Sequence, residues 1–334
     1  MGPSRFLLFI TASVLLLVAS ASASACSHGQ RRMLEKCSSD QDCDAGLYCF
    51  YCVEGFSSYK CVRLKKNLTM CYCRNGVQAL MLDTYDFRGD VWLCHSFKGH
   101  CYDYTAFGPA IDTLKEIEAF LSANPSEIVT IILEDYVQAF KGLTKVFTDA
   151  GLMKYWFPVR NMPKNGQDWP LVKDMVKNNQ RLLVFTSINS KEKSEGIAYQ
   201  WNYMVENQII IFDKTGTLNC FCRSCPNRAE SSSLSDKSKS LVLVNYFRTI
   251  SMKELACIDN SRDLIDMLHT CYGAAGNRWA NFVAVNYYKR SQGGESFQAV
   301  DTINGKLSCG CDDIHECGPG SSLSAVCSTQ DKLQ

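Results

Sequence analysis

Short apolar runs alternate with amphipathic segments along most of the chain, and this alternation is the main clue to its fold. The runs predict buried strands, which lie at Val77–Asp83, Val91–Cys94, Ile128–Leu133, Arg181–Thr186, Leu241–Phe247 and Asn281–Tyr287. Between them, apolar residues recur at helical spacing in Phe107–Ala123, Trp169–Asn178 and Leu264–Cys271. This order predicts a parallel α/β domain, which we place at residues 70–317, with a (β/α) barrel as the leading version.

The first 25 residues have the pattern of a cleavable secretory signal. Arg5 precedes an apolar run from Phe6 to Val18, and small residues fill positions 19–25. The run is too short to span a bilayer comfortably. We therefore expect a secreted protein whose mature chain begins near Cys26. Residues 318–334 form a polar tail, and the sequence predicts neither a transmembrane segment nor a lipid anchor.

All 19 cysteines follow this signal, and residues 26–69 are especially rich in them. In an exported chain such density predicts disulfides, so we interpret residues 26–69 as a small disulfide-stapled module. Because 19 is an odd number, at least one thiol is expected to be free or paired with another chain. Zinc is the alternative, since two sets of cysteines have suitable spacings, Cys49 with Cys52 and Cys220 with Cys222 and Cys225.

The charge balance makes a polyanionic partner improbable. The chain has 35 basic and 34 acidic residues, and the basic residues are dispersed, so nucleic acid is not an expected partner. A hydrophobic content of 46% is typical of a globular chain with a full core.

Ionisable residues directly follow three of the predicted strands. Asp83, His95 and Glu134 each come at the end of an apolar run, and in parallel α/β domains such ends meet at one mouth. A carboxylate pair can hold a hard cation such as Ca²⁺, and a histidine can pass a proton. An alternative interpretation of Asp86 and Asp135 is that each caps the helix that follows, and an alternative for His95 is a partly buried structural histidine.

The same segments resemble a known family. Met81–Asp86, Val91–Phe97, Ile128–Asp135 and Trp201–Asn207 resemble the X-domain of phosphatidylinositol phospholipases C, most closely a secreted, Cys-rich plant-type branch. The likeness runs from about Cys37 to Cys317. It implies a TIM-like (β/α) barrel of the PLC-like phosphodiesterase type, which cuts an inositol phospholipid or related phosphodiester at a membrane surface.

The resemblance also implies roles for individual residues. His95 matches the family's proton donor to the leaving alcohol, and Asp83 and Glu134 match ligands of a catalytic Ca²⁺. Met81 stands where the family has a further acidic ligand, so the ligand set for Ca²⁺ is incomplete. We add three candidates for lining the substrate pocket, Tyr85, Tyr246 and Asn286.

One part of the family pattern is missing. The barrel of the family begins with a strand that ends in a Thr-His-Asn motif, whose histidine acts as general base, and the stretch from Cys61 to Gly76 has no such motif. We therefore expect a barrel without its first strand and a catalytically impaired enzyme, because loss of one acid/base group costs about 10²–10⁴-fold in rate. The alternative is a non-catalytic secreted module that binds a lipid headgroup, a glycan or a cell-surface partner. A disulfide-stapled structural protein is a third possibility.

Two further motifs stand apart from this interpretation. Ile209–Leu218 is similar to the phosphorylation motif of P-type ion pumps, with Asp213 as the acceptor, but the membrane helices of such pumps are missing, so we interpret it as coincidence. Asn67–Thr69 is a glycosylation sequon, which predicts a glycan on Asn67.

Overall fold

The computed structural model describes residues 36–38, 48–50, 60–62, 76–95, 99–208, 224–248, 256–260, 262–288 and 295–317, and has a mixed α/β fold. Its strands are β1 (Tyr48–Phe50), β2 (Lys60–Val62), β3 (Ala79–Phe87), β4 (Asp90–Cys94), β5 (Ala106–Pro109), β6 (Val129–Tyr136), β7 (Leu182–Thr186), β8 (Ala198–Tyr199), β9 (Met204–Glu206), β10 (Leu241–Asn245) and β11 (Phe282–Ala284). Its α-helices are α3 (Ala110–Ala123), α4 (Gly142–Asp149), α5 (Val172–Lys177), α6 (Ser190–Glu195), α7 (Ala256–Asp259), α8 (Arg262–Ala274) and α9 (Glu295–Ser308). Short 3-10 helices are η2 (Leu152–Tyr155), η3 (Val159–Asn161), η4 (Gln200–Asn202) and η5 (Ile314–Glu316).

The predicted Cys-rich module is described only in short pieces. Strands β1 and β2 pair antiparallel, and a disulfide joins Cys37 to Cys49. The predicted signal at residues 1–25, the polar tail at 318–334, Asn67 and the segment Ile209–Leu218 lie outside the described residues.

Six strands form the larger sheet, in the order β5-β4-β3-β6-β7-β8. Strands β3, β6, β7 and β8 are mutually parallel, as the sequence predicts. The central strands β6 and β7 are buried along almost their whole length, because helices cover one face and the rest of the core covers the other.

The prediction of a parallel sheet is wrong for β4, which pairs antiparallel with both β3 and β5. Strand β4 returns antiparallel to β3, with Phe87 paired to Asp90 across a two-residue turn. Both turn residues have positive φ, 51° at Arg88 and 79° at Gly89, the geometry that matches the twist of a tight hairpin. The start of the predicted helix at Phe107 is instead strand β5, and α3 begins only at Ala110, after Pro109.

A second sheet contains β11, β10 and β9, all parallel. Among the described residues no strand pairing joins the two sheets, so they are not one closed sheet there. They do share a core. Ile132 of β6, Phe185 of β7, Met204 of β9 and Leu243 of β10 belong to one buried cluster, so the inner faces of the two sheets pack together.

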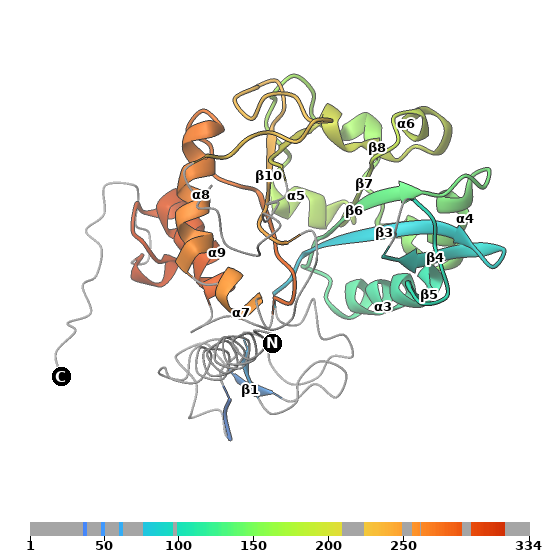
Figure 1. The fold of residues 1–334 in the computed structure, drawn as a ribbon, viewed down its shortest axis with the longest axis horizontal. Coiled ribbons are helices and arrows are strands. Elements are labelled where there is room, and N and C mark those ends of the chain that lie inside the picture. The colour runs from blue at the N-terminus through green and yellow to red at the C-terminus, as the bar shows by residue number, and fades with distance from the viewer. Residues whose placement is uncertain are drawn as a thin grey trace, which may run out of the picture.

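Helices cover the outer face of each sheet (Figure 1). Helices α3 and α4 pack on the larger sheet, where Leu121 and Phe147 join the outward residues of β6 and β7. Helices α8 and α9 pack on β10, through residues such as Leu264 and Ile303. No helix within the described ranges has both the length and the apolar character needed to cross a bilayer.

Nine of the described cysteines are disulfide-bonded, as predicted for a chain in an oxidising compartment. Cys94 pairs with Cys101, Cys225 with Cys271, and Cys309 with Cys317. The zinc alternative is therefore wrong for Cys225 and Cys49, whose sulfur atoms are already bonded.

Candidate functional site

Asp83 of β3 and Glu134 of β6 are direct neighbours in the parallel ladder. Side chains alternate between the two faces of a strand, so Glu134 shares the face of Ile132, which belongs to the inner core. Adjacent strands lie about 4.8 Å apart, and the two carboxylates are therefore held side by side on the inner face. The structure thus brings together the two acidic residues that the sequence singled out.

This arrangement changes the ionisation of Asp83. Burial, with a smaller contribution from the neighbouring charge of Glu134, raises the pKa of Asp83 to about 7, while Arg228 acts in the opposite direction. The excess of negative charge makes this pair of carboxyl groups a site for a proton or a cation.

Two tyrosines support the pair. Tyr136 donates a hydrogen bond of 2.5 Å to Oε1 of Glu134, and the Tyr136 pKa is raised by burial and by this bond. The rings of Tyr85 and Tyr136 stack with centroids 4.5 Å apart. Tyr85 is only 2% exposed, so in this structure it packs in the wall of the site.

His95 directly follows β4 and does not come from a parallel strand end, because β4 runs antiparallel to β3. The pairing of β4 with β5 is irregular between Leu93 and Cys94, directly before His95. His95 is exposed. Within the described ranges its side chain makes no hydrogen bond or ion pair with Asp83 or Glu134, and the meeting of all three groups stays a prediction.

Asp135 has a structural role, but it does not cap the following helix, because α4 begins after Lys141 and has no side-chain cap. Its side chain is fully buried, forms an ion pair of 2.9 Å with Lys191 and accepts hydrogen bonds from Thr186 and the backbone N–H of Val137. These contacts join β6, β7 and α6.

Asp86 fixes the loop after β6. Its carboxylate accepts hydrogen bonds from the backbone N–H groups of Gln138 and Ala139, at 2.5 and 3.0 Å. The hairpin tip between β3 and β4 is thereby tied to this loop.

The sequence analysis missed a buried glutamate on the same inner face. Glu206 ends β9 two residues after Met204, is fully buried, and accepts hydrogen bonds from Gln200, Trp201 and Asn245. The Nη1 atom of Arg228 lies 3.2 Å from its Oε1 atom. Glu206 lies within the Trp201–Asn207 stretch, and a charged residue closing an apolar run was the available signal.

The other two predicted pocket residues, Tyr246 and Asn286, line one small pocket beyond the ends of β10 and β11. Arg248 and Asp259 form an ion pair of 2.7 Å in its wall. The lining residues do not include Asp83 or Glu134, so a role of this pocket in substrate binding stays a prediction.

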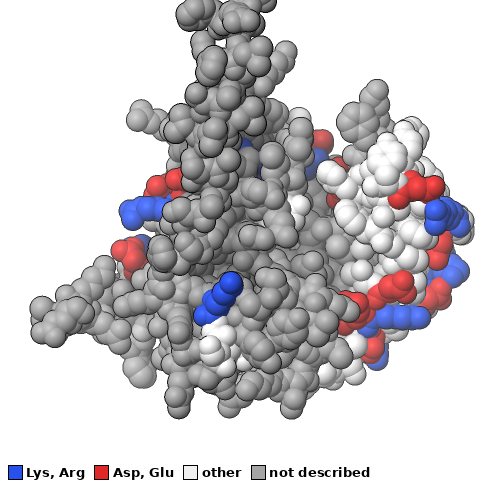
Figure 2. Space-filling model, turned by 60° about the horizontal axis from the view of Figure 1, so that its bottom comes forward, with Lys and Arg blue, Asp and Glu red and all other residues white. Residues whose placement is uncertain are grey.

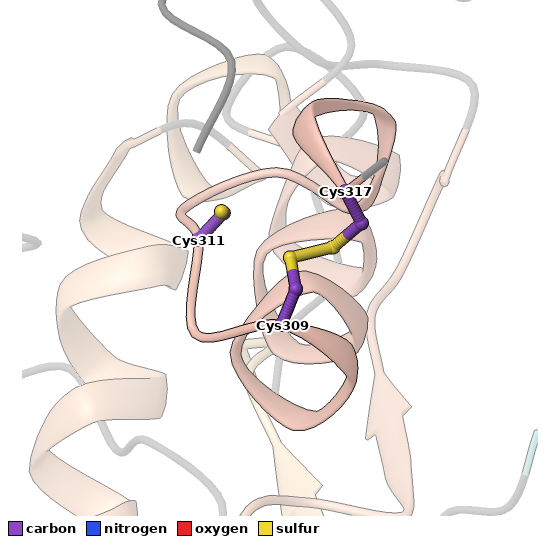
Figure 3. Close-up of side chains that lie close together, drawn as sticks. All are labelled: Cys309, Cys311 and Cys317. Carbon is purple, nitrogen blue, oxygen red and sulfur yellow. A yellow bond between two sulfur atoms is a disulfide. The ribbon is translucent and has the colours of Figure 1, made fainter. Parts of the chain in front are cut away.

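Two clusters near the C-terminal end of the described chain have the composition of metal sites. In the first, Cys309 and Cys317 are joined by a disulfide beside Cys311 (Figure 3). Cys311 is itself disulfide-bonded, so these sulfur atoms are not free thiolates.

The second cluster contains Asp301, Asp313 and His315. Asp313 caps η5, where its Oδ1 lies 2.9 Å from the backbone nitrogen of His315 and 2.7 Å from the ring Nδ1. Its other carboxylate oxygen accepts a hydrogen bond from Gln298. Local capping accounts for this geometry.

Comparison with known proteins places these residues in a family. A family model described as PI-PLC X 1 matches residues 62–300, which is more than half of the chain. The chain belongs to the PI-PLC X family. A PI-PLC X domain-containing protein of Arabidopsis thaliana is 45% identical over 357 residues, which cover 93% of this chain and 82% of the relative.

More distant members and structures also match this PI-PLC X chain. An uncharacterized secreted protein of Arthroderma benhamiae is 22% identical over 249 residues, 69% of this chain and 54% of that protein. A solved structure from work on membrane binding by the S. aureus phosphatidylinositol-specific phospholipase C matches 70% of this chain and 83% of that chain, with 11% identity and a TM-score of 0.39.

Proposed function

We propose that this protein is a secreted phospholipase C-like phosphodiesterase whose site is centred on Asp83 and Glu134. The observation that supports this most strongly is the direct pairing of the two carboxylates on the inner face of the larger sheet. The disulfides and the secreted relative support an extracellular location. We also propose that the two sheets belong to one (β/α) barrel without its first strand, because their inner faces share a core.

The substrate in this proposal is an inositol phospholipid or a related phosphodiester. Asp83 and Glu134 would hold a cation such as Ca²⁺, which neutralises phosphate charge. Ca²⁺ takes six to eight oxygen ligands. The two carboxylates fit part of that shell, and within the described part of the chain no third carboxylate or histidine joins them, so water and substrate oxygens would complete it.

Acid/base catalysis has less structural support than the cation site. The resemblance assigns proton donation to His95, which among the described residues forms no hydrogen bond or ion pair with the two carboxylates. The sequence also lacks the histidine that would act as general base. These two features also favour the second candidate function, a binding module that keeps the site but does not turn over substrate.

Calcium titration of the full chain tests the site. We expect Asp83→Asn and Glu134→Gln each to weaken Ca²⁺ binding by at least about tenfold, because each removes a charged oxygen ligand. Asp112→Asn is the matched control, since Asp112 is an exposed carboxylate on α3. Binding that is the same in wild type and in Asp83→Asn would contradict the proposed site.

Hydrolysis of phosphatidylinositol vesicles separates the two candidate functions. A weak activity that falls further in His95→Ala supports the impaired enzyme. Ca²⁺-dependent vesicle binding without hydrolysis supports the binding module. Hydrolysis as fast as that of a relative with both histidines would refute the proposed impairment.

A further inference from the structure

A disulfide lies directly beside His95 in the chain. Cys94, the last residue of β4, is 1% exposed, and its sulfur is bonded to Cys101, which lies 7 residues further along. The two Cα atoms are 5.8 Å apart. His95 is the next residue after Cys94 and is exposed. A covalent bond therefore fixes the backbone at the point where the chain leaves the sheet and presents His95.

A hydrogen-bonded turn holds the other end of this bond. The N–H of His95 donates to the carbonyl of Thr105 at 2.9 Å. The N–H of Thr105 donates to the carbonyl of Tyr102 at 2.9 Å, and the N–H of Tyr102 donates to the Thr105 hydroxyl at the same distance. Because Tyr102 directly follows Cys101, the disulfide and the turn together close one unit around the backbone of His95.

The sheet alone gives this position little support. The pairing of β4 with β3 ends at Leu93, and the pairing with β5 skips Phe107 between Leu93 and Cys94. An extra residue of this kind bends the strand and disrupts its ladder. His95 therefore stands at an irregular end of the sheet, where the disulfide makes up for the lost pairing.

An exposed ion pair also joins this turn to the β3–β4 hairpin. Arg88 lies 2.9 Å from Asp103, and the two side chains are 58% and 75% exposed. Exposed pairs contribute little to stability. Figure 2 shows acidic and basic side chains intermixed along the described surface on the right, the side that holds β3–β5 in Figure 1. The disulfide is therefore the stronger of the two connections.

We propose that the disulfide between Cys94 and Cys101 positions His95 for proton transfer. The inference rests on the proposed function, in which His95 donates a proton to the leaving alcohol. A proton donor has to stay within about 2.6–3.2 Å of the oxygen it serves, and a displacement of about 1 Å can cost about 100-fold in rate. Both cysteines act through His95, and neither sulfur touches the substrate.

Backbone ¹⁵N relaxation of the full chain tests the positioning. We expect an order parameter of about 0.85 at His95 in wild type, the value of rigid backbone, and below about 0.6 in the double variant Cys94→Ala/Cys101→Ala. Leu93, inside β4, should keep its value in both proteins. If the double variant does not fold, Cys94→Val with Cys101→Ala replaces it, because valine restores apolar volume at the buried position.

The matched control is the double variant Cys309→Ala/Cys317→Ala. It removes a disulfide whose cysteines are 8 residues apart, nearly the same spacing, at the end of α9. The order parameter of His95 should be the same in this control and in wild type.

A double-mutant cycle on phosphatidylinositol hydrolysis tests whether the positioning acts through His95. We expect the loss of Cys94 and Cys101 to lower kcat by about 10–100-fold with little change in KM. His95→Ala should lower kcat in wild type and cause no further loss in the double variant. A disulfide that only stabilises the fold would give additive losses.

Two outcomes would overturn the proposal. One is an order parameter at His95 that is the same in wild type and in the double variant. The other is a full further loss from His95→Ala in the double variant. The proposed function fails separately: wild type that binds Ca²⁺ and does not hydrolyse phosphatidylinositol refutes the enzyme, and the order parameter still decides whether the disulfide fixes His95.

Discussion

Folding raises the pKa of Asp83, a carboxyl group of the candidate site, well above its ordinary value. A carboxyl group with a pKa of about 7 is half protonated at neutral pH, whereas in the unfolded chain it ionises near 3.8. Between these two values the folded state retains a proton that the unfolded state has released. The free energy of unfolding therefore falls as pH rises from about 4 to about 7. Above pH 7 the whole destabilisation from the ionised Asp83 is present.

Asp83→Asn should remove this dependence. We expect the variant to gain about 1–3 kcal/mol of unfolding free energy relative to wild type between pH 5 and pH 8, since each pKa unit corresponds to about 1.4 kcal/mol. Urea unfolding at the two pH values measures the gain. The unfolding free energy of Asp112→Asn should differ from that of wild type by the same amount at pH 5 and at pH 8. If the difference for Asp83→Asn is also the same at the two pH values, the raised pKa is contradicted.

At the scale of single elements, β6 carries two adjacent acidic residues with different tasks. Glu134 faces the inner site, and Asp135 on the opposite face is locked to Lys191 of α6 and Thr186 of β7. The Lys191 ammonium also donates to the carbonyl of Val137 at 2.7 Å. This ion pair positions α6 against the end of the sheet.

Lys191→Met should be strongly destabilising, because it leaves the Asp135 charge buried without its partner. Removal of one member of such a pair costs about 3–5 kcal/mol. Glu134→Gln, one residue from Asp135, should change the unfolding free energy by less than about 1 kcal/mol, since it breaks no buried ion pair. Urea denaturation of both variants checks the contrast, and similar losses in the two would contradict it.

The elements also show what a sequence can reveal. The central strands and helix α3 were predictable because their apolar periodicity is strong, and the pairing of Asp83 with Glu134 followed from two parallel strand ends. The direction of β4 was missed because it depends on the left-handed turn at Arg88 and Gly89. The contact of Arg228 with Glu206 was not predictable, since it joins a strand to a loop 22 residues away.

At the scale of the whole molecule, a disulfide secures the part of the chain that carries Arg228. Cys225 lies three residues before Arg228 and is bonded to Cys271 of α8, across 46 residues. The bond holds the loop between β9 and β10 against the outer helices. Arg228 is thereby kept at the inner face beside Glu206.

Replacement of both cysteines by alanine should lower the unfolding free energy by about 4 kcal/mol, the loop entropy expected for a closed segment of this length. The pair Cys309 and Cys317 closes only 8 residues and should cost about 2.5 kcal/mol when replaced in the same way. Thermal unfolding of both double variants under non-reducing conditions gives the comparison. A larger loss for the shorter loop would contradict this ranking.

The separation of Glu134 from Asp135 has a consequence for protein engineering. Asp135 and Lys191 can be left untouched as the scaffold, because their ion pair joins β6 to α6. Position 134, on the opposite face of the same strand, can then be varied to change the ion or ligand that the candidate site prefers.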